Sequence, residues 1–175
     1  MEKFPLTSRF LHWLIALLIF FMLGLGLYMV HFLSKEAANR TDLYLLHKSI
    51  GVIILFLVII RIINRFTNYY PPLPDTMKRW EIILAHFNHT LVYILMLLVP
   101  LSGYLMSNAF GYPVLLFGVE LPFLMQKNLE LAPMIHESHW ILAYILIAAL
   151  VLHIAGVIKH RYFDRPEHDV LKRMI

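Results

Sequence analysis

Four long hydrophobic runs, separated by shorter polar stretches, dominate the chain. They cover about residues 10–33, 43–65, 82–107 and 135–160. A helix needs about 20 apolar residues to cross a hydrocarbon layer of about 30 Å, and each run reaches that length. The pattern therefore predicts an all-α fold, a four-helix transmembrane bundle in which residues 1–175 form a single membrane domain. Pro100 and Gly103 are expected to interrupt the third helix near its end.

Two of the connections between the runs differ in character. Residues 68–74, NYYPPLP, form a proline-rich turn that does not continue a helix. Residues 109–134 make a longer loop that is still hydrophobic. We expect this loop to lie in the outer membrane interface and to cap the bundle, with a short interfacial helix as a weakly signalled option.

Composition agrees with the hydropathy pattern. Hydrophobic residues make up 60% of the chain and charged residues only 15%, a balance that favours an integral membrane protein over a soluble domain. Cysteine is absent, which excludes disulfides, thiolate zinc sites, cysteine-held iron–sulfur clusters and covalent haem attachment. We expect a lipid bilayer, and no nucleic acid, among the partners of this chain.

Basic residues are distributed unevenly between the two sides of the predicted bundle. Eleven of the 15 fall in the N-terminal segment, the second connection and the C-terminal tail, namely Lys3, Arg9, Arg61, Arg65, Lys78, Arg79, Lys159, Arg161, Arg165, Lys172 and Arg173. Cytoplasmic segments of membrane proteins carry an excess of Lys and Arg. The distribution therefore predicts that both termini are cytoplasmic.

The ten histidines form two groups at two depths. The cytoplasmic group is His12, His86, His89, His153, His160 and His168, and the outer group is His31, His47, His136 and His139. Ionisable side chains within a bilayer are costly and usually functional. Two groups at two depths therefore suggest two sites, one in each leaflet.

Helical phase selects two histidines of the fourth run as partners on one face. His139 and His153 are 14 residues apart, which corresponds to about 21 Å and about 40° short of whole turns. His136 is about 100° out of phase with His153, so His139 is the better outer candidate. Two haems stacked in a bundle need such a pair, because each haem iron takes one axial imidazole from each of two helices.

Depth then pairs the remaining candidates. His47 with His139 would hold an outer haem iron, and His153 with His12 a cytoplasmic one, although geometry alone does not separate His12 from His86 and His89. Small residues four positions from the candidates favour room for a flat ring, namely Ala16, Gly51, Ala143 and Ala149. The alternative is that these histidines are polar residues hydrogen-bonded across helices.

Other polar residues have weaker assignments as neighbours of a haem or a quinone. Arg9, Arg61, Arg65 and Lys159 are candidates to pair with haem propionates, although topology already explains their charge. His86 and His89 could shape a quinone pocket, and His160 could lie near a propionate. His31 and His168 are expected to be interfacial or solvated.

Several short segments together resemble the prokaryotic cytochrome b561 family. They are RFLHWL at 9–14, LHKSIG at 46–51, HWILAYILIAALVLH at 139–153 and KHRYF at 159–163. The resemblance implies a multi-pass protein of the bacterial inner membrane with two non-covalent b haems. It implies axial ligands on the first, second and fourth helices, which correspond here to His12, His47, His139 and His153. One departure is that the His-Glu pair usual at the outer ligand stands here at His136-Glu137, whereas the in-phase position has His139-Trp140.

Three functions are compatible with this pattern. The leading hypothesis is a two-haem electron-transfer cytochrome that passes electrons between a donor and membrane quinone. Some family members resemble superoxide oxidases, and positive charge on the outer side, including Lys48 beside His47, would attract that anion. The alternatives are a cytochrome b subunit that anchors a larger oxidoreductase through a partner protein and, ranked lower, a histidine-based proton or metal transporter. The four runs lack the buried Asp and Glu that transporters usually carry.

Overall fold

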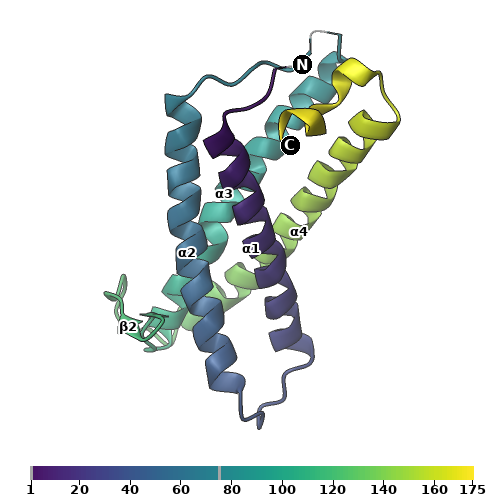
Figure 1. The fold of residues 1–175 in the computed structure, drawn as a ribbon. Coiled ribbons are helices and arrows are strands. Elements are labelled where there is room, and N and C mark those ends of the chain that lie inside the picture. The colour runs from purple at the N-terminus through teal and green to yellow at the C-terminus, as the bar shows by residue number, and fades with distance from the viewer. Residues whose placement is uncertain (1, 75) are drawn as a thin grey trace.

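Four long helices form the protein in the computed structural model, which describes residues 2–74 and 76–175 (Figure 1). They are α1 (Leu6–His31), α2 (Arg40–Thr67), α3 (Arg79–Ala109) and α4 (Ala132–Tyr162). Each is long and apolar enough to cross a membrane. The all-α four-helix bundle predicted from the hydrophobic runs is confirmed. The helices mostly extend past the runs by two to four residues, because polar residues continue the helix beyond its apolar part.

Packing between the helices follows chain order. α1 packs on α2, α2 on α3 and α3 on α4, whereas within the described residues α4 packs closely against neither α1 nor α2. The hydrophobic core comprises Ile15, Ile19, Ile54, Val58, Leu95, Met96, Leu146 and Ala149. Large apolar side chains on the outside of the bundle, such as Leu17 and Phe20, are exposed, as a lipid-facing surface requires.

Helix α3 continues through Pro100 as one element, so the predicted interruption is wrong. Proline removes a backbone donor and therefore frees a carbonyl within the helix. The freed carbonyl is that of Met96, four residues before Pro100, and in the same part of the helix Ser102 Oγ donates to the Val99 carbonyl at 2.8 Å. Membrane helices tolerate proline where such side chains and neighbouring helices satisfy the freed groups.

The loop after α3 forms a small β-hairpin, and no helix occurs between Phe110 and Leu131. Strand β1 (Leu115–Leu116) pairs antiparallel with β2 (Val119–Glu120). The two-residue turn has positive φ at both positions, 48° at Phe117 and 96° at Gly118, as a type I′ turn requires. Buried Ser49 of α2 anchors this hairpin, since its Oγ donates to the Leu115 carbonyl and accepts from the Phe117 N–H. The weakly signalled interfacial helix is therefore replaced by a cap that is fastened to α2.

Both termini lie at the end of the bundle opposite this hairpin (Figure 1). We refer to the two ends as the terminal end and the hairpin end. After α4, two short 3₁₀ helices, η1 (Pro166–His168) and η2 (Val170–Arg173), fold back against the N-terminal segment. The Phe4 N–H donates to the Arg173 carbonyl at 3.0 Å, and the Trp13 indole donates to the Met174 carbonyl at 2.9 Å. His168 in this tail is 7% exposed, so the expectation that it is interfacial or solvated is wrong.

Candidate functional site

Two histidine pairs join α4 to the helices α1 and α2, against which it does not pack closely. In each pair the two rings face each other. Toward the hairpin end, the rings of His47 on α2 and His139 on α4 have centroids 6.4 Å apart. Toward the terminal end, the rings of His12 on α1 and His153 on α4 have centroids 6.2 Å apart. All four side chains are half-buried. The structure thus brings together both pairs that depth and phase suggest.

The spacing within each pair matches that of two axial ligands on one metal ion. A metal–imidazole nitrogen bond is about 2.0 Å, and an imidazole ring has a radius of about 1.1 Å given its bond lengths. Rings bound on opposite sides of one ion therefore have centroids about 6.3 Å apart. The separations of 6.2 and 6.4 Å agree with this value.

The other candidate for the terminal-end pair, His89, fits this geometry less well. Its ring centroid lies 5.1 Å from that of His153, which is shorter than opposing ligands require. Its Nδ1 is hydrogen-bonded at 2.7 Å to the Ala85 carbonyl of its own helix. The nearby His86 is exposed. His89 therefore lies beside the pair, and the ring spacing favours His12 as the partner of His153.

A hydrogen bond to the backbone orients the ring of His139. Its Nδ1 lies 3.0 Å from the Val99 carbonyl and 3.0 Å from Ser102 Oγ. Because the carbonyl only accepts, Nδ1 carries the proton, and Nε2 is left as the lone-pair nitrogen. Metal-binding histidines commonly show this arrangement, in which the second ring nitrogen donates to a carbonyl. In contrast, His136 is exposed.

Glycines on two helices lie against the hairpin-end pair, His47 and His139, and their place at this pair is not predicted from the sequence. A Cβ built on Gly103 would approach His139 Cε1 to 3.0 Å, and one on Gly26 would approach His47 Cε1 to 3.6 Å. Small residues in membrane helices often mark a close approach, and this signal could have identified both. By comparison, Gly51 faces Met22, and Ala149 lies in the hydrophobic core. These two small residues serve helix packing.

Substitution of Gly103 by alanine is expected to displace the His139 ring by a few tenths of an ångström. The added Cβ would stand 3.0 Å from Cε1 and 3.3 Å from Nδ1 of His139, so the ring must move relative to Val99 and Ser102. We expect weaker retention of any cofactor at the hairpin-end pair, measured as the cofactor-to-protein ratio after purification. Gly24→Ala is the matched control, because nothing lies within 4 Å of its added Cβ. Equal ratios in the two variants would contradict a tight site at His139.

The environment of His47 combines an unsatisfied nitrogen with a nearby positive charge. Its Nδ1 is buried and has no hydrogen-bond partner among the described residues. The next residue, Lys48, is half-buried. Its ammonium is 3.4 Å from the Pro113 carbonyl and 5.7 Å from the centre of the Tyr112 ring.

Arginines at the terminal end contact the chain itself. Arg61 donates to His12 Nδ1 at 3.2 Å and to the Ser8 carbonyl at 3.0 Å. Arg9 donates to the carbonyl of Ile175 at 2.8 Å and so helps to hold the tail. Of these two candidates, Arg61 therefore contacts the histidine pair directly.

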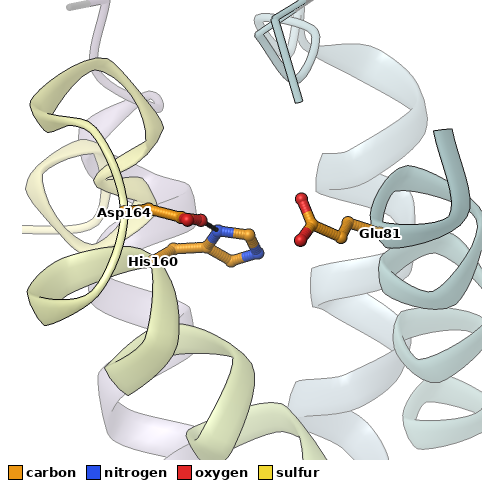
Figure 2. A group of neighbouring side chains, drawn as sticks. All are labelled: Glu81, His160 and Asp164. Carbon is orange, nitrogen blue, oxygen red and sulfur yellow. Dashed lines mark hydrogen bonds and ion pairs between the residues drawn. The ribbon is translucent and has the colours of Figure 1, made fainter. Parts of the chain in front are cut away.

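His160 belongs to a separate cluster with Glu81 and Asp164 (Figure 2). Its Nδ1 is 2.6 Å from Asp164 Oδ2. Glu81 is buried at the start of α3, one residue before the third predicted run. A buried carboxylate therefore lies directly beside the third run, although outside it.

Comparison with known proteins adds a family to this geometry. The model of the prokaryotic cytochrome b561 family matches residues 3–175. The chain is 32% identical to "Cytochrome b561 homolog 2" of Escherichia coli (strain K12), over 99% of this chain and 92% of the relative. It is 26% identical to "Probable superoxide oxidase CybB" of Yersinia pestis, over 92% of this chain and 90% of the relative. A match of this extent, over a bundle whose four helices could each cross a membrane, shows that the chain belongs to the prokaryotic cytochrome b561 family of membrane electron-transfer proteins.

Proposed function

We propose that this protein is a transmembrane electron-transfer cytochrome with two non-covalent b haems. His12 and His153 would bind one haem iron, and His47 and His139 the other. The observation that carries the proposal is the ring spacing of 6.2 and 6.4 Å in two pairs at different depths. The unpartnered Nδ1 of His47 and the space kept open by Gly26 and Gly103 also support it.

The chain's own residues would determine what such a cofactor does. Haem b supplies one-electron redox chemistry when it is bound. Two imidazoles on one iron would leave no position open for small ligands, which favours electron transfer. The backbone bond from His139 keeps the Nε2 lone pair directed away from Val99.

Arg61 would change partners when the site is loaded. While it donates to Nδ1 of His12, a neutral His12 ring carries its proton on Nε2. If His12 bound iron through Nε2, its proton would have to be on Nδ1. Arg61 would then have to release the ring. Its guanidinium would then be free to pair with a carboxylate such as a haem propionate.

The distribution of charge supports one orientation in the membrane. Most basic residues lie at the terminal end, so this end would face the cytoplasm and the hairpin end the outside of a bacterial inner membrane. His139 and His153 are separated by about 21 Å along α4. Electrons could therefore pass between the two leaflets along this helix.

We further propose superoxide as donor at the hairpin end and membrane quinone as acceptor. Each superoxide would lose one electron and leave as dioxygen, and a quinone that gains two electrons and two protons would become quinol. The name of the Yersinia pestis relative supports the donor, as does the positive charge of Lys48 beside His47.

Spectroscopy on the purified protein tests this function in two stages. We expect a Soret band, haem reduction on stopped-flow mixing with superoxide, and reoxidation of the reduced haems by a short-chain quinone. A protein without a Soret band contradicts the whole proposal. Haems that stay oxidised in superoxide, but exchange electrons with quinone, contradict only the donor.

Lys48→Gln is expected to slow haem reduction by superoxide by about two- to tenfold at low salt, because nearby positive charge steers small anions. The effect should shrink as ionic strength rises, since exposed charges are then screened. Lys35→Gln is the matched control: it makes the same change in net charge in an exposed loop at the same end. Equal slowing in both variants would indicate general steering and no local role for Lys48.

A further inference from the structure

A second cluster of potential ligands lies at the terminal end, apart from the histidine pairs. Glu81 at the start of α3, His160 near the end of α4 and Asp164 just beyond it converge on one point (Figure 2). One ligand atom from each lies within 4.8 Å of the other two. Figure 2 shows the His160 ring between the two carboxylates, with one nitrogen on Asp164 and the other facing Glu81.

The cluster already holds a cation supplied by the chain. The Lys159 ammonium forms ion pairs with Glu81 and with Asp164, the latter at 2.8 Å. One ammonium thus faces two carboxylates and leaves one negative charge uncompensated, whereas a divalent ion in its place would match both carboxylates. The Lys159 side chain is 38% exposed, so its ammonium can move into water. The neighbouring carboxylate of Asp169 has a separate partner in Arg161.

An independent feature of the tail points to a missing partner at the same place. His168 is 7% exposed, and its Nδ1 has no hydrogen-bond partner in the described chain. This nitrogen lies 3.7 Å from Asp164 Oδ2, close to the spacing of about 3.3 Å between two ligand atoms on one tetrahedral zinc ion. The other ring nitrogen, Nε2, is hydrogen-bonded to Thr76 Oγ1 at 2.8 Å. A hydrogen bond on the second nitrogen commonly fixes the ring of a metal-binding histidine. A buried polar atom without a partner is costly, and a bound cation would remove that cost.

We propose that Glu81, His160 and Asp164 bind one divalent transition-metal ion of the zinc class in exchange for the Lys159 ammonium, and that His168, whose Nδ1 lies beside Asp164, moves in as a fourth ligand. Two imidazole nitrogens and two carboxylate oxygens are donors that zinc accepts in proteins. Metal ligands must be deprotonated. Asp164 meets this requirement, because its carboxylate already forms an ion pair with Lys159. A bound ion would connect the start of α3, the end of α4 and the C-terminal tail.

Competition with Lys159 distinguishes this site from a plain ion-pair network. If the ammonium and the metal ion use the same carboxylates, Lys159→Met removes the competitor and should tighten zinc binding about tenfold. If the cluster is only an ion-pair network, the same substitution removes its cation and creates no metal site. The two interpretations therefore predict different zinc binding by Lys159→Met: tighter binding for a metal site and none for an ion-pair network.

Equilibrium dialysis against zinc tests the proposal on the haem-loaded protein in detergent, after treatment with a chelator. We expect the wild type to bind one zinc ion per chain, Lys159→Met to bind it more tightly, and Glu81→Gln and Asp164→Asn to lose it. His31→Gln is the matched control, because His31 is an exposed histidine at the opposite end.

Thermal unfolding provides a second measurement, since a ligand that binds only the folded state raises the Tm. Zinc should raise the Tm of the wild type but not that of the two ligand variants. The proposal would be overturned by absence of bound zinc in both wild type and Lys159→Met, or by zinc binding in Glu81→Gln and Asp164→Asn as tight as in the wild type. Both outcomes are independent of whether the haems exchange electrons with quinone.

Discussion

Replacing His139 with alanine is expected to halve the haem content of the purified protein, whereas replacing His136 leaves it unchanged. His139 is half-buried, and its ring faces His47 at 6.4 Å. Its Nδ1 bonds to Val99 and Ser102, so the substitution removes an oriented ligand. His136 is exposed and lies nearly one helical turn before His139, with its side chain directed about 60° away around the helix. The pyridine haemochrome assay gives the haem-to-protein ratio that separates the two variants.

The same pair of variants tests the departure from the family pattern. The usual His-Glu pair stands at His136-Glu137, so a ligand at His136 would reverse the expected result. A halved ratio in His136→Ala together with a full ratio in His139→Ala would show that the ring spacing misassigns the outer ligand. Circular dichroism at the helix bands has to show that both variants remain folded.

Replacing His153 with alanine is expected to remove the other haem and with it electron transfer between the two sides of the membrane. The ring of His153 faces that of His12 at 6.2 Å, and loss of either ligand leaves iron with one axial imidazole. His12→Ala should therefore have the same effect on the haem ratio. His89→Ala is the control for a nearby imidazole, because His89 is hydrogen-bonded to its own helix.

The outcome can be followed in vesicles with superoxide generated outside and quinone supplied in the membrane. Haem reduction without quinol formation in His153→Ala would place the lost haem between the outer site and the quinone. If His89→Ala loses haem while His12→Ala keeps it, the third helix provides the ligand. The partner of His153 would then be His89, the alternative to His12 that the sequence left open.

Hydropathy predicted the helices well because lipid imposes a simple rule. Every backbone polar group in a bilayer needs a partner within the protein, so each long apolar run becomes a helix. Helical phase also placed His139 and His153 on one face, since rise and rotation per residue are constant. The effect of Pro100 was misjudged because it depends on the helices packed around the proline, which hydropathy does not show.

Contacts between distant segments could not be predicted in the same way. Burial of His168 depends on how the tail folds back and on Thr76 from the second connection. The hairpin that caps α2 depends on Ser49, which is 66 residues from Leu115. Nothing local in the chain encodes either contact, because each requires that the helices are already packed.

By itself, the sequence determined the number of helices, the two depths at which histidines gather and the shared face of His139 and His153. These properties follow from chain length, side-chain polarity and helix geometry, which are all local. Only the tertiary structure decided that His47 and His12 approach α4 at spacings of 6.4 and 6.2 Å, that Gly103 lies against His139, and that Glu81 meets Asp164 through Lys159. Those distances arise from the packing of whole helices against one another, which is set by the sum of many weak contacts.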